Sequence, residues 1–315
     1  MVTDWYQPEF SLESEALTAA GIGWSLPDWR PPPPPREEQV KNLLARIARL
    51  PRLDAVLFVL APLPAEVIDA LPSTCRFLQR VGIGLDNVDL ERARLRGIAV
   101  DNTPDYAIEE VAVHALGMML SLHRQLPATQ SHLLAGHWRT QPPETIERLS
   151  TLTLGVVGLG RIGRRFAGLA RPLFARGLFH DPAVGAAPPG MEAAALETVL
   201  RESDVVSLHC PLLPSTRDLI NARTLALMKP TALLINVSRG ALVDAPALAG
   251  AIRGGKLAGA GLDVYEPEIL PADSPLRALG DRVILTSHTA WYSRQSTRDC
   301  RVQAMEKLIR KLKEP

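Results

Sequence analysis

Three segments of the chain place reactive side chains directly after apolar runs that are typical of buried strands. Arg239 follows the run 233–235, and His288 ends the segment 283–288. Residues 261–268 carry several carboxylates beyond a third such run. An arginine fork suits a carboxylate ligand, and a histidine changes its charge near neutral pH. Ligands of open α/β sheets bind outside the carboxyl ends of the strands, so we expect all three segments to converge on one crevice.

A glycine-rich turn in the middle of the chain has the pattern of a dinucleotide-binding loop. It follows the apolar run 154–157 and opens a helix. Its glycines let the backbone turn tightly and approach a pyrophosphate, whose charge is met by N–H groups at the helix N-terminus. The residues of this turn that we expect to contact the cofactor are Gly158, Gly160, Arg161, Ile162 and Gly163.

An acidic residue follows this turn at the spacing of a dinucleotide site. Asp181 lies 18 residues after Gly163, at the end of the apolar stretch 178–180. A carboxylate there accepts hydrogen bonds from both ribose hydroxyls and repels a 2′-phosphate. No Arg or Lys occurs in the ten residues after Asp181, which favours NAD over NADP. The alternative is that Asp181 and Pro182 simply cap a strand and begin a turn.

The elements that position these residues alternate between strand and helix from residue 152 onward. This alternation predicts an α/β fold with a doubly wound parallel sheet. The expected strands are 151–158, 178–180, 205–209, 232–237, 258–264 and 283–288. The expected helices are one after residue 158 and those at 196–200, 219–228 and 245–252.

The first hundred residues indicate a second, less regular α/β unit. We expect strands at 2–3, 22–26, 54–60 and 76–81, a helix at 37–50, and then a loop with Gly82 and Gly84. The run Pro31–Pro35 predicts a stiff polyproline II stretch, either a docking ligand or, as we favour, a surface spacer.

Two more helices are expected outside this alternation. The segment 108–126 is apolar over most of its circumference, which predicts burial in a core or against another subunit. The segment 297–312 is amphipathic and basic at its end, which complements the helix dipole.

The composition excludes several classes of protein. The 315 residues include 35 Lys plus Arg and 34 Asp plus Glu, so the net charge of +1 predicts no nucleic-acid or anionic-membrane surface. Cys75, Cys210 and Cys300 share no metal-ligand spacing, so we expect no disulfide framework and no metal site. Asp4 and Glu9 interrupt any apolar run at the start, and no later run reaches the length of a membrane span. We expect a cytoplasmic protein of two domains.

At this point the sequence resembles the D-isomer-specific 2-hydroxyacid dehydrogenases, and within them the subgroup of the C-terminal binding protein. The resemblance runs from about residue 80 to 311. The segments that carry it are VGIGLDNVDL, LGVVGLGRIG, HCPLLPSTRDLI, INVSRGALVDAPALAGAI, AGAGLDVYEPE and SHTAWYSRQS. It implies two Rossmann-like domains: a flavodoxin-like substrate domain of residues 1–100 and 291–315, and an inserted NAD-binding Rossmann domain of residues 101–290.

The resemblance also implies a reaction, the transfer of a hydride between the nicotinamide of NAD(H) and C2 of a small 2-keto or 2-hydroxy acid. It makes His288 the general acid/base and Glu268 the partner that fixes the tautomer of the imidazole. Arg239 would hold the substrate carboxylate and carbonyl. The alternatives are a structural His288, a surface ion pair for Arg239, and Glu266 in place of Glu268.

Further contacts follow from the resemblance alone. Asp263 would meet the nicotinamide amide, or else cap a strand. The other implied cofactor contacts are Cys210, Pro211, Thr216, Val237 and Ser238. The implied substrate contacts are Arg80, Ile83, Gly84 and Trp291, the first and last of which line the pocket in the C-terminal binding protein subgroup. Cys210 could instead be an ordinary buried thiol, and Trp291 a hinge-packing aromatic. We interpret His114, His180 and His209 as structural.

The sequence departs from the family at a few positions. Ser287 replaces a proline before the histidine, Thr289 and Ala290 replace a glycine-containing tail, and Val113 replaces a common glutamate. Two other functions stay open: an NAD(H)-sensing regulatory scaffold and a phosphite-type dehydrogenase. The apolar helix 108–126 and the habit of the family predict a homodimer.

Overall fold

The computed structural model describes residues 1–315 apart from 6–8, 27–33, 139–145 and 315. The chain divides into two compact units. Unit 1 consists of Met1–Ala107 and Ser293–Pro315, and unit 2 consists of Ile108–Tyr292. Both units are built on parallel sheets, so the predicted α/β class with two domains is confirmed. No helix among the described residues combines the length and the apolar character that a bilayer crossing needs.

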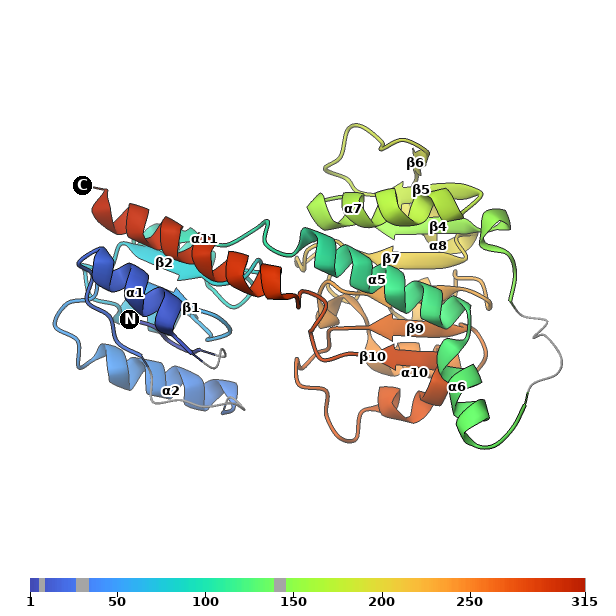
Figure 1. The fold of residues 1–315 in the computed structure, drawn as a ribbon, viewed down its shortest axis with the longest axis horizontal. Helices are drawn as coiled ribbons and strands as arrows, with labels where there is room; N and C mark the ends of the chain where they lie inside the picture. Colours follow the sequence, from blue (N-terminus) through green and yellow to red (C-terminus); the bar gives the residue numbers. More distant parts are fainter. Residues whose placement is uncertain (6–8, 27–33, 139–145, 315) are drawn as a thin grey trace. The chain divides into compact units, whose positions relative to one another are not determined.

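The described part of unit 2 contains a parallel sheet with the strand order β10-β9-β8-β7-β4-β5-β6 (Figure 1). Its strands are β4 (Thr153–Val157), β5 (Arg176–His180), β6 (Met191–Ala193), β7 (Val205–Leu208), β8 (Leu233–Asn236), β9 (Gly259–Leu262) and β10 (Val283–Leu285). The chain begins this sheet at the central strand β4 and reverses its direction of winding between β4 and β7. This is the order of a dinucleotide-binding Rossmann fold, and a ligand crevice is expected at the reversal.

Helices cover both faces of this sheet. They are α5 (Ile108–His123), α6 (Leu126–Leu134), α7 (Arg161–Ala170), α8 (Leu196–Glu202), α9 (Ala222–Leu225) and α10 (Ala245–Arg253). Short 3₁₀ turns are η1 (Leu149–Thr151), η2 (Arg171–Leu173), η3 (Gly240–Leu242) and η4 (Pro275–Arg282). Figure 1 shows α5 and α7 together on one face. Apolar residues of α8, α9 and α10 pack with those of the strands into one core.

The helix expected at 108–126 is α5, which ends three residues earlier, and a second helix, α6, follows it. α5 ends at His123, and Gln125 takes a left-handed conformation with φ of 52° before Pro127 enters the first turn of α6. A left-handed residue breaks the helical hydrogen-bond ladder. Six residues of α5 are buried, as the apolar pattern predicts, but Val113 is exposed.

Unit 1 contains β1 (Ala55–Phe58), β2 (Phe77–Arg80) and β3 (Ala99–Asp101), which pair in parallel in this order. Val2 forms a parallel bridge to Leu57 of β1, and its N–H donates to the carbonyl of Ser25. Val2 therefore lies beside β1 at one edge of the three-stranded sheet, and Ser25 lies beside Val2. The strand predicted at 22–26 is wrong. In the described structure these residues pair with Val2 through one backbone hydrogen bond, which does not form a strand ladder.

Helices from both ends of the chain cover the unit 1 sheet. The helices are α1 (Ser11–Ala19), α2 (Arg36–Ile47), α3 (Ala65–Ala70), α4 (Leu90–Leu95) and α11 (Arg294–Lys313). Ala304, Met305 and Leu308 of α11 are buried against Leu57 and Phe77. Pro31–Pro33 of the proline run lie outside the described residues, and Pro35 is extended directly before α2.

Candidate active site

The three glycines of the turn after β4 each have a distinct steric reason. Gly158 has φ of 90°, and a Cβ on it would lie 2.3 Å from the backbone nitrogen of Cys210. A Cβ on Gly163 would lie 2.1 Å from the carbonyl oxygen of Gly158. A Cβ on Gly160 would meet no atom within 4 Å. The first glycine therefore permits the turn, the third permits close packing of α7, and the second faces open space.

This open space fits the pyrophosphate of a dinucleotide. Gly160 is the N-cap of α7 and makes no side-chain cap, so the first N–H groups of the helix are directed at the space that Gly160 leaves. An anion is favoured at such a helix end by the aligned N–H groups and the helix dipole. The residues present fit NAD, with Arg161 and Ile162 in the first turn of α7.

Asp181 follows β5 and reaches the same turn. Its Oδ2 accepts a hydrogen bond of 2.6 Å from the N–H of Leu159, and its Oδ1 accepts one of 2.9 Å from Ala183. The carboxylate thus joins the ends of β4 and β5 beside the glycine turn. This is where a ribose would follow a pyrophosphate in a Rossmann crevice.

The loop after β7 lies against the glycine turn. Burial raises the pKa of the Cys210 thiol to about 11, so this side chain stays protonated at neutral pH. Thr216 closes the loop with a hydrogen bond of 2.7 Å from its hydroxyl to the carbonyl of Pro211. Cys210 therefore contributes its backbone to the crevice wall through the contact with Gly158.

Arg239 lies in a loop that a buried side chain stabilises. Asn236, at the end of β8, accepts a hydrogen bond of 3.0 Å from the N–H of Ser238 and donates one of 2.8 Å to the carbonyl of Arg239. Val237 is buried and Arg239 is half-buried. The next residue, Gly240, lies so close to the backbone of Tyr265 that a Cβ would be 1.9 Å from its carbonyl carbon. The loops after β8 and β9 are therefore packed directly together.

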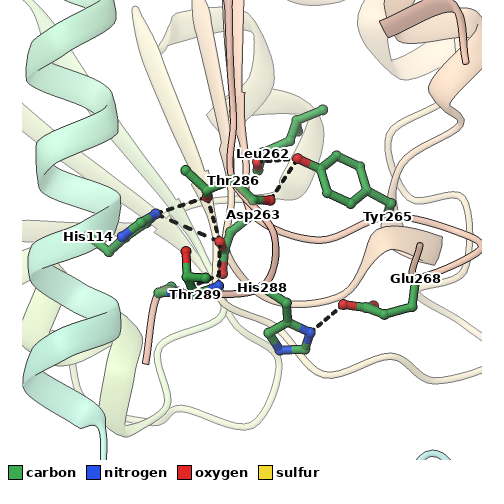
Figure 2. Close-up of polar contacts among 9 residues, drawn as sticks. His114, Leu262, Asp263, Tyr265, Glu268, Thr286, His288 and Thr289 are labelled. Atoms are coloured by element: carbon green, nitrogen blue, oxygen red, sulfur yellow. Dashed lines mark hydrogen bonds and ion pairs between the residues drawn. The ribbon is translucent and has the colours of Figure 1, made fainter. Parts of the chain in front are cut away.

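Asp263 organises the turn that carries the histidine. It is fully buried, and its Oδ1 accepts hydrogen bonds from the Thr286 hydroxyl at 2.5 Å and the Thr289 N–H at 2.9 Å (Figure 2). Its Oδ2 accepts one of 3.0 Å from the N–H of Ala290. The backbone N–H of His288 donates to the carbonyl of Asp263 at 2.8 Å. Asp263 therefore fixes the chain on both sides of His288.

His288 and Glu268 are in contact, as the sequence predicts. The Nδ1 of His288 is hydrogen-bonded to Oε1 of Glu268 (Figure 2). The two side chains are 38% and 45% exposed, so the pair lies at the surface of unit 2 and is open to a ligand. Contact through Nδ1 leaves Nε2 as the ring nitrogen directed away from the glutamate. Among the described residues, Glu266, the alternative partner, makes no hydrogen bond or ion pair with the ring.

The expected substrate contacts are divided between the two units. In unit 1, the N–H of Gly82 donates to the Thr103 hydroxyl at 2.8 Å, and Asn102 donates to the carbonyl of Ile83 at 2.6 Å, so the loop before Gly84 is anchored. Arg80, at the end of β2, lies over the ring of Phe58 at 5.8 Å. In unit 2, Trp291 packs edge-on against Tyr292, with ring centroids 4.5 Å apart.

Sequence reasoning missed three residues of this site. Asn236 shapes the Arg239 loop, and Thr286 and His114 bind the turn of His288. Asn236 could have been recognised from its position in the segment INVSRG. His114, interpreted above as structural, lies 3.1 Å from the Thr286 hydroxyl although 172 positions separate the two residues. Spacing along the chain cannot reveal such a contact.

Comparison with known proteins identifies this arrangement. Residues 116–290 match the model of the "D-isomer specific 2-hydroxyacid dehydrogenase, NAD binding domain", which confirms the predicted NAD-binding domain. A glyoxylate reductase of Thermofilum pendens is 37% identical over 271 residues, 84% of this chain and 76% of that protein. A D-lactate dehydrogenase of Aquifex aeolicus, solved with NAD and lactic acid, has a TM-score of 0.85 and 27% identity over 99% of this chain and 94% of that one.

A further relative is longer than this chain. A D-3-phosphoglycerate dehydrogenase of Mycobacterium bovis is 40% identical over 246 residues, 77% of this chain but 46% of that protein. The chain thus spans about half the length of that relative. The matched domain and the glyoxylate reductase cover enough sequence to decide the family. The chain belongs to the D-isomer specific 2-hydroxyacid dehydrogenases, and residues 116–290 form its NAD-binding domain.

Proposed function

We propose that this protein is an NAD-dependent D-2-hydroxyacid dehydrogenase that works as a 2-keto acid reductase. The observation that carries the proposal is the contact between His288 and Glu268 on the turn after β10. That turn follows the carboxyl edge of the same sheet whose β4 end carries the glycine turn. An acid/base pair and a dinucleotide turn on one crevice edge are the requirements of a hydride-transfer site.

Bound NAD(H) supplies or accepts the hydride at C2 of the acid. His288 carries the proton: it gives one to the carbonyl oxygen in reduction and takes one from the hydroxyl in oxidation. Glu268 accepts the hydrogen on Nδ1 and thereby directs Nε2 to the substrate. Glu268 also balances the charge of the imidazolium before the proton leaves. A positioned acid/base of this kind contributes roughly 10²–10⁴-fold to a rate.

The proposed substrate contacts begin with the side chain of Arg239 and the backbone of Ile83 and Gly84. Arg239 offers a planar fork that suits the carboxylate and carbonyl of a 2-keto acid. In the described structure the backbone N–H groups of Ile83 and Gly84 make no hydrogen bond, so they are available for a carboxylate oxygen. Arg80 and Trp291 complete the proposed contacts. These last two residues match positions that line the pocket in the C-terminal binding protein subgroup.

The cofactor contacts are assigned on sterics and position. Gly158, Gly160 and Gly163 make room for the pyrophosphate, and Asp181 is placed to accept from the ribose. The remaining proposed contacts are Arg161, Ile162, Cys210, Pro211, Thr216, Val237, Ser238 and Asp263. Residues 1–107 with 293–315 would then be the substrate domain, and the NAD-binding domain would be inserted within it.

The substrate is proposed to be a small 2-keto acid. The names of similar proteins, glyoxylate reductase and D-lactate dehydrogenase, indicate small acids of this class. We also propose a cytoplasmic homodimer. Unit 2 exposes apolar side chains along α5, α6 and the residues after them, which a second copy could cover: Val113, Leu126, Leu133, Leu134 and Trp138. Sedimentation at several concentrations tests the dimer.

A panel of 2-keto acids with NADH tests the activity. We expect loss of NADH absorbance with at least one acid from glyoxylate to aromatic members. The His288→Ala variant should lose about 10²–10⁴-fold in kcat and keep its affinity for NADH. Tight NADH binding without reduction of any acid would favour the NAD(H)-sensing scaffold. Oxidation of phosphite would favour the inorganic substrate, and a fully active His288→Ala variant would refute the mechanism.

A further inference from the structure

Thr286 is fixed at its backbone and at its side chain, although no motif in the sequence singled it out. It directly follows β10 and precedes His288 by two residues. Its N–H donates to the carbonyl of Leu262 at 3.0 Å, and its own carbonyl lies 2.8 Å from the Tyr265 hydroxyl. Its hydroxyl donates to the buried carboxylate of Asp263 at 2.5 Å (Figure 2). The residue is thus bound to the end of β9 in three ways.

A fourth contact comes from the helix α5. Nε2 of His114 lies 3.1 Å from the hydroxyl oxygen of Thr286 and 3.8 Å from Oδ1 of Asp263 (Figure 2). A threonine hydroxyl has one hydrogen, and here that hydrogen is donated to Asp263. The hydroxyl oxygen can therefore only accept from His114. It follows that Nε2 of His114 carries a hydrogen, directed at the hydroxyl and the carboxylate together.

The turn that Thr286 begins holds His288 in an unfavourable backbone conformation. His288 has φ of 55°, in the left-handed region that glycine favours. Such a residue persists when its surroundings determine it by several contacts. Here these contacts are the N–H groups of His288, Thr289 and Ala290, all of which donate to Asp263. The Thr286 hydroxyl also donates to the Asp263 carboxylate, and His114 contacts that hydroxyl.

We infer that Thr286 and His114 are positioning residues: they hold the Asp263 carboxylate, and through it the left-handed turn that aims His288 at Glu268. Neither side chain needs to touch substrate or cofactor for this role. The inference rests on the proposed function for its catalytic consequence alone. The geometric part, that the Thr286 hydroxyl stabilises residues 286–292, stands independently of any activity.

Two substitutions of Thr286 test the inference against a matched control. Thr286→Val removes the hydroxyl and keeps the shape, whereas Thr286→Ser keeps the hydroxyl. The control is Thr224→Val, which removes a threonine hydroxyl elsewhere in unit 2. That hydroxyl donates to Leu219 at 2.9 Å and accepts from Asn221 in the capping box of α9, away from the turn. The control reports the general cost of losing a buried threonine hydroxyl.

Amide hydrogen exchange of the segment 286–292 gives the first readout, with or without a substrate. We expect Thr286→Val to speed exchange there about tenfold, the effect of losing one hydrogen bond to a charged group. Thr286→Ser should exchange like the wild type, and Thr224→Val should leave this segment unchanged. Unchanged exchange in Thr286→Val, or equal acceleration by Thr224→Val, would overturn the inference.

Steady-state kinetics give the second readout once a 2-keto acid is reduced. We expect Thr286→Val to lower kcat by about 10–100-fold while the Kd for NADH changes less than about twofold, with Thr286→Ser close to wild type. An unaltered kcat in Thr286→Val would refute the positioning role. If the wild type reduces no acid, the proposed function fails, and hydrogen exchange alone then decides whether Thr286 anchors the turn.

Discussion

The contact between His288 and Glu268 lies at the surface of unit 2, and this has an energetic consequence. Exposed ion pairs contribute about 0–1 kcal/mol to stability, because water screens both charges and the side chains lose entropy. His288 and Glu268 are 38% and 45% exposed. Their contact therefore contributes little to the free energy of folding, which is consistent with the proposed catalytic role. The carboxylate of Asp263, in contrast, is fully buried and accepts several hydrogen bonds.

Glu268→Gln separates these two roles. We expect kcat for the 2-keto acid to fall by about tenfold or more, since glutamine cannot balance the imidazolium charge. The melting temperature should stay within about 2 °C of the wild type, since the pair is exposed. Kinetics and a thermal melt on the same preparation measure both. A variant that melts much lower yet retains kcat would make Glu268 a structural residue.

His209 presents the opposite case, a histidine buried without charge. Burial lowers its pKa from the ordinary 6.5 to about 3, and its Nε2 lies 2.9 Å from the Ser207 hydroxyl. Between these two pH values the unfolded chain binds one proton more than the folded chain at this residue. The free energy of unfolding therefore falls as the pH drops below 6.5.

The variant His209→Gln should weaken this pH dependence. Glutamine can hydrogen-bond Ser207 but does not titrate. We expect the slope of unfolding free energy against pH, between pH 6 and 4, to be smaller by about 1.4 kcal/mol per pH unit than in the wild type. Denaturant titrations at three pH values measure the two slopes, and all other groups cancel in the difference. Parallel slopes would show that His209 is protonated in the folded state.

The roles of single residues could be predicted only where a short sequence motif contains them. His288 and Glu268 were paired correctly because a strand end and a short loop bring them together. Thr286 was overlooked and His114 was assigned a structural role, because their partners come from α5, β9 and β10. The residues that bind the reactive group are recognisable by motif, but those that hold it in place depend on packing.

At the scale of elements, the turn from β4 to α7 combines folding and function in three glycines. Two of them are required by the chain itself, since a Cβ on Gly158 or Gly163 would collide with backbone atoms. Gly160 has no such neighbour in the described structure. The sequence presents the three glycines as one motif, whereas the structure shows that a side chain would have a different effect at each position.

Alanine substitutions of these glycines should therefore behave differently. Gly158→Ala and Gly163→Ala should destabilise unit 2 by several kcal/mol, because backbone atoms must move. Gly160→Ala should melt like the wild type and lose affinity for NADH, because the added methyl occupies the space assigned to the pyrophosphate. Thermal melts and NADH fluorescence titrations measure the two effects. Unaltered NADH binding by a folded Gly160→Ala protein would contradict the proposed phosphate site.

Element prediction succeeded where a strand is buried on both faces. β1, β7 and β8 are continuous apolar runs, and all of their residues are buried. Two edge strands were not predicted: β3 and β6 have three residues each and are largely exposed or half-buried, so no apolar pattern marks them. The false strand at 22–26 lies beyond Val2 at the other edge. Short edge strands take their structure from their neighbours.

At the scale of the whole molecule, both ends of the chain are needed to complete unit 1. Arg301 of α11 makes hydrogen bonds of 2.6 and 2.8 Å to the carboxylate of Glu13 in α1, and these side chains are 11% and 0% exposed. Residues 288 positions apart thus form one buried pair. This pair physically links the two segments of unit 1.

Breaking that pair should weaken unit 1 and leave unit 2 intact. Arg301→Met leaves the carboxylate of Glu13 buried without its partner, which costs about 3–5 kcal/mol. We expect unit 1 to unfold at a lower denaturant concentration than in the wild type. Hydrogen exchange of α1 and α11 should become faster, while exchange in β4 to β9 should be unchanged. The double variant Arg301→Met with Glu13→Leu should regain most of the loss. Equal destabilisation of both units would mean that the chain unfolds as one body.

Unit 2 has a sheet and a hydrophobic core of its own. Its sheet, its main core and the glycine turn all lie within residues 108–292. We therefore expect a fragment of these residues to fold and to bind NADH with an affinity close to that of the full chain. The same fragment should reduce no 2-keto acid, because the proposed contacts Arg80, Ile83 and Gly84 are absent from it. A folded fragment that still reduces keto acids at the full rate would contradict the proposed roles of Arg80, Ile83 and Gly84 in binding the substrate.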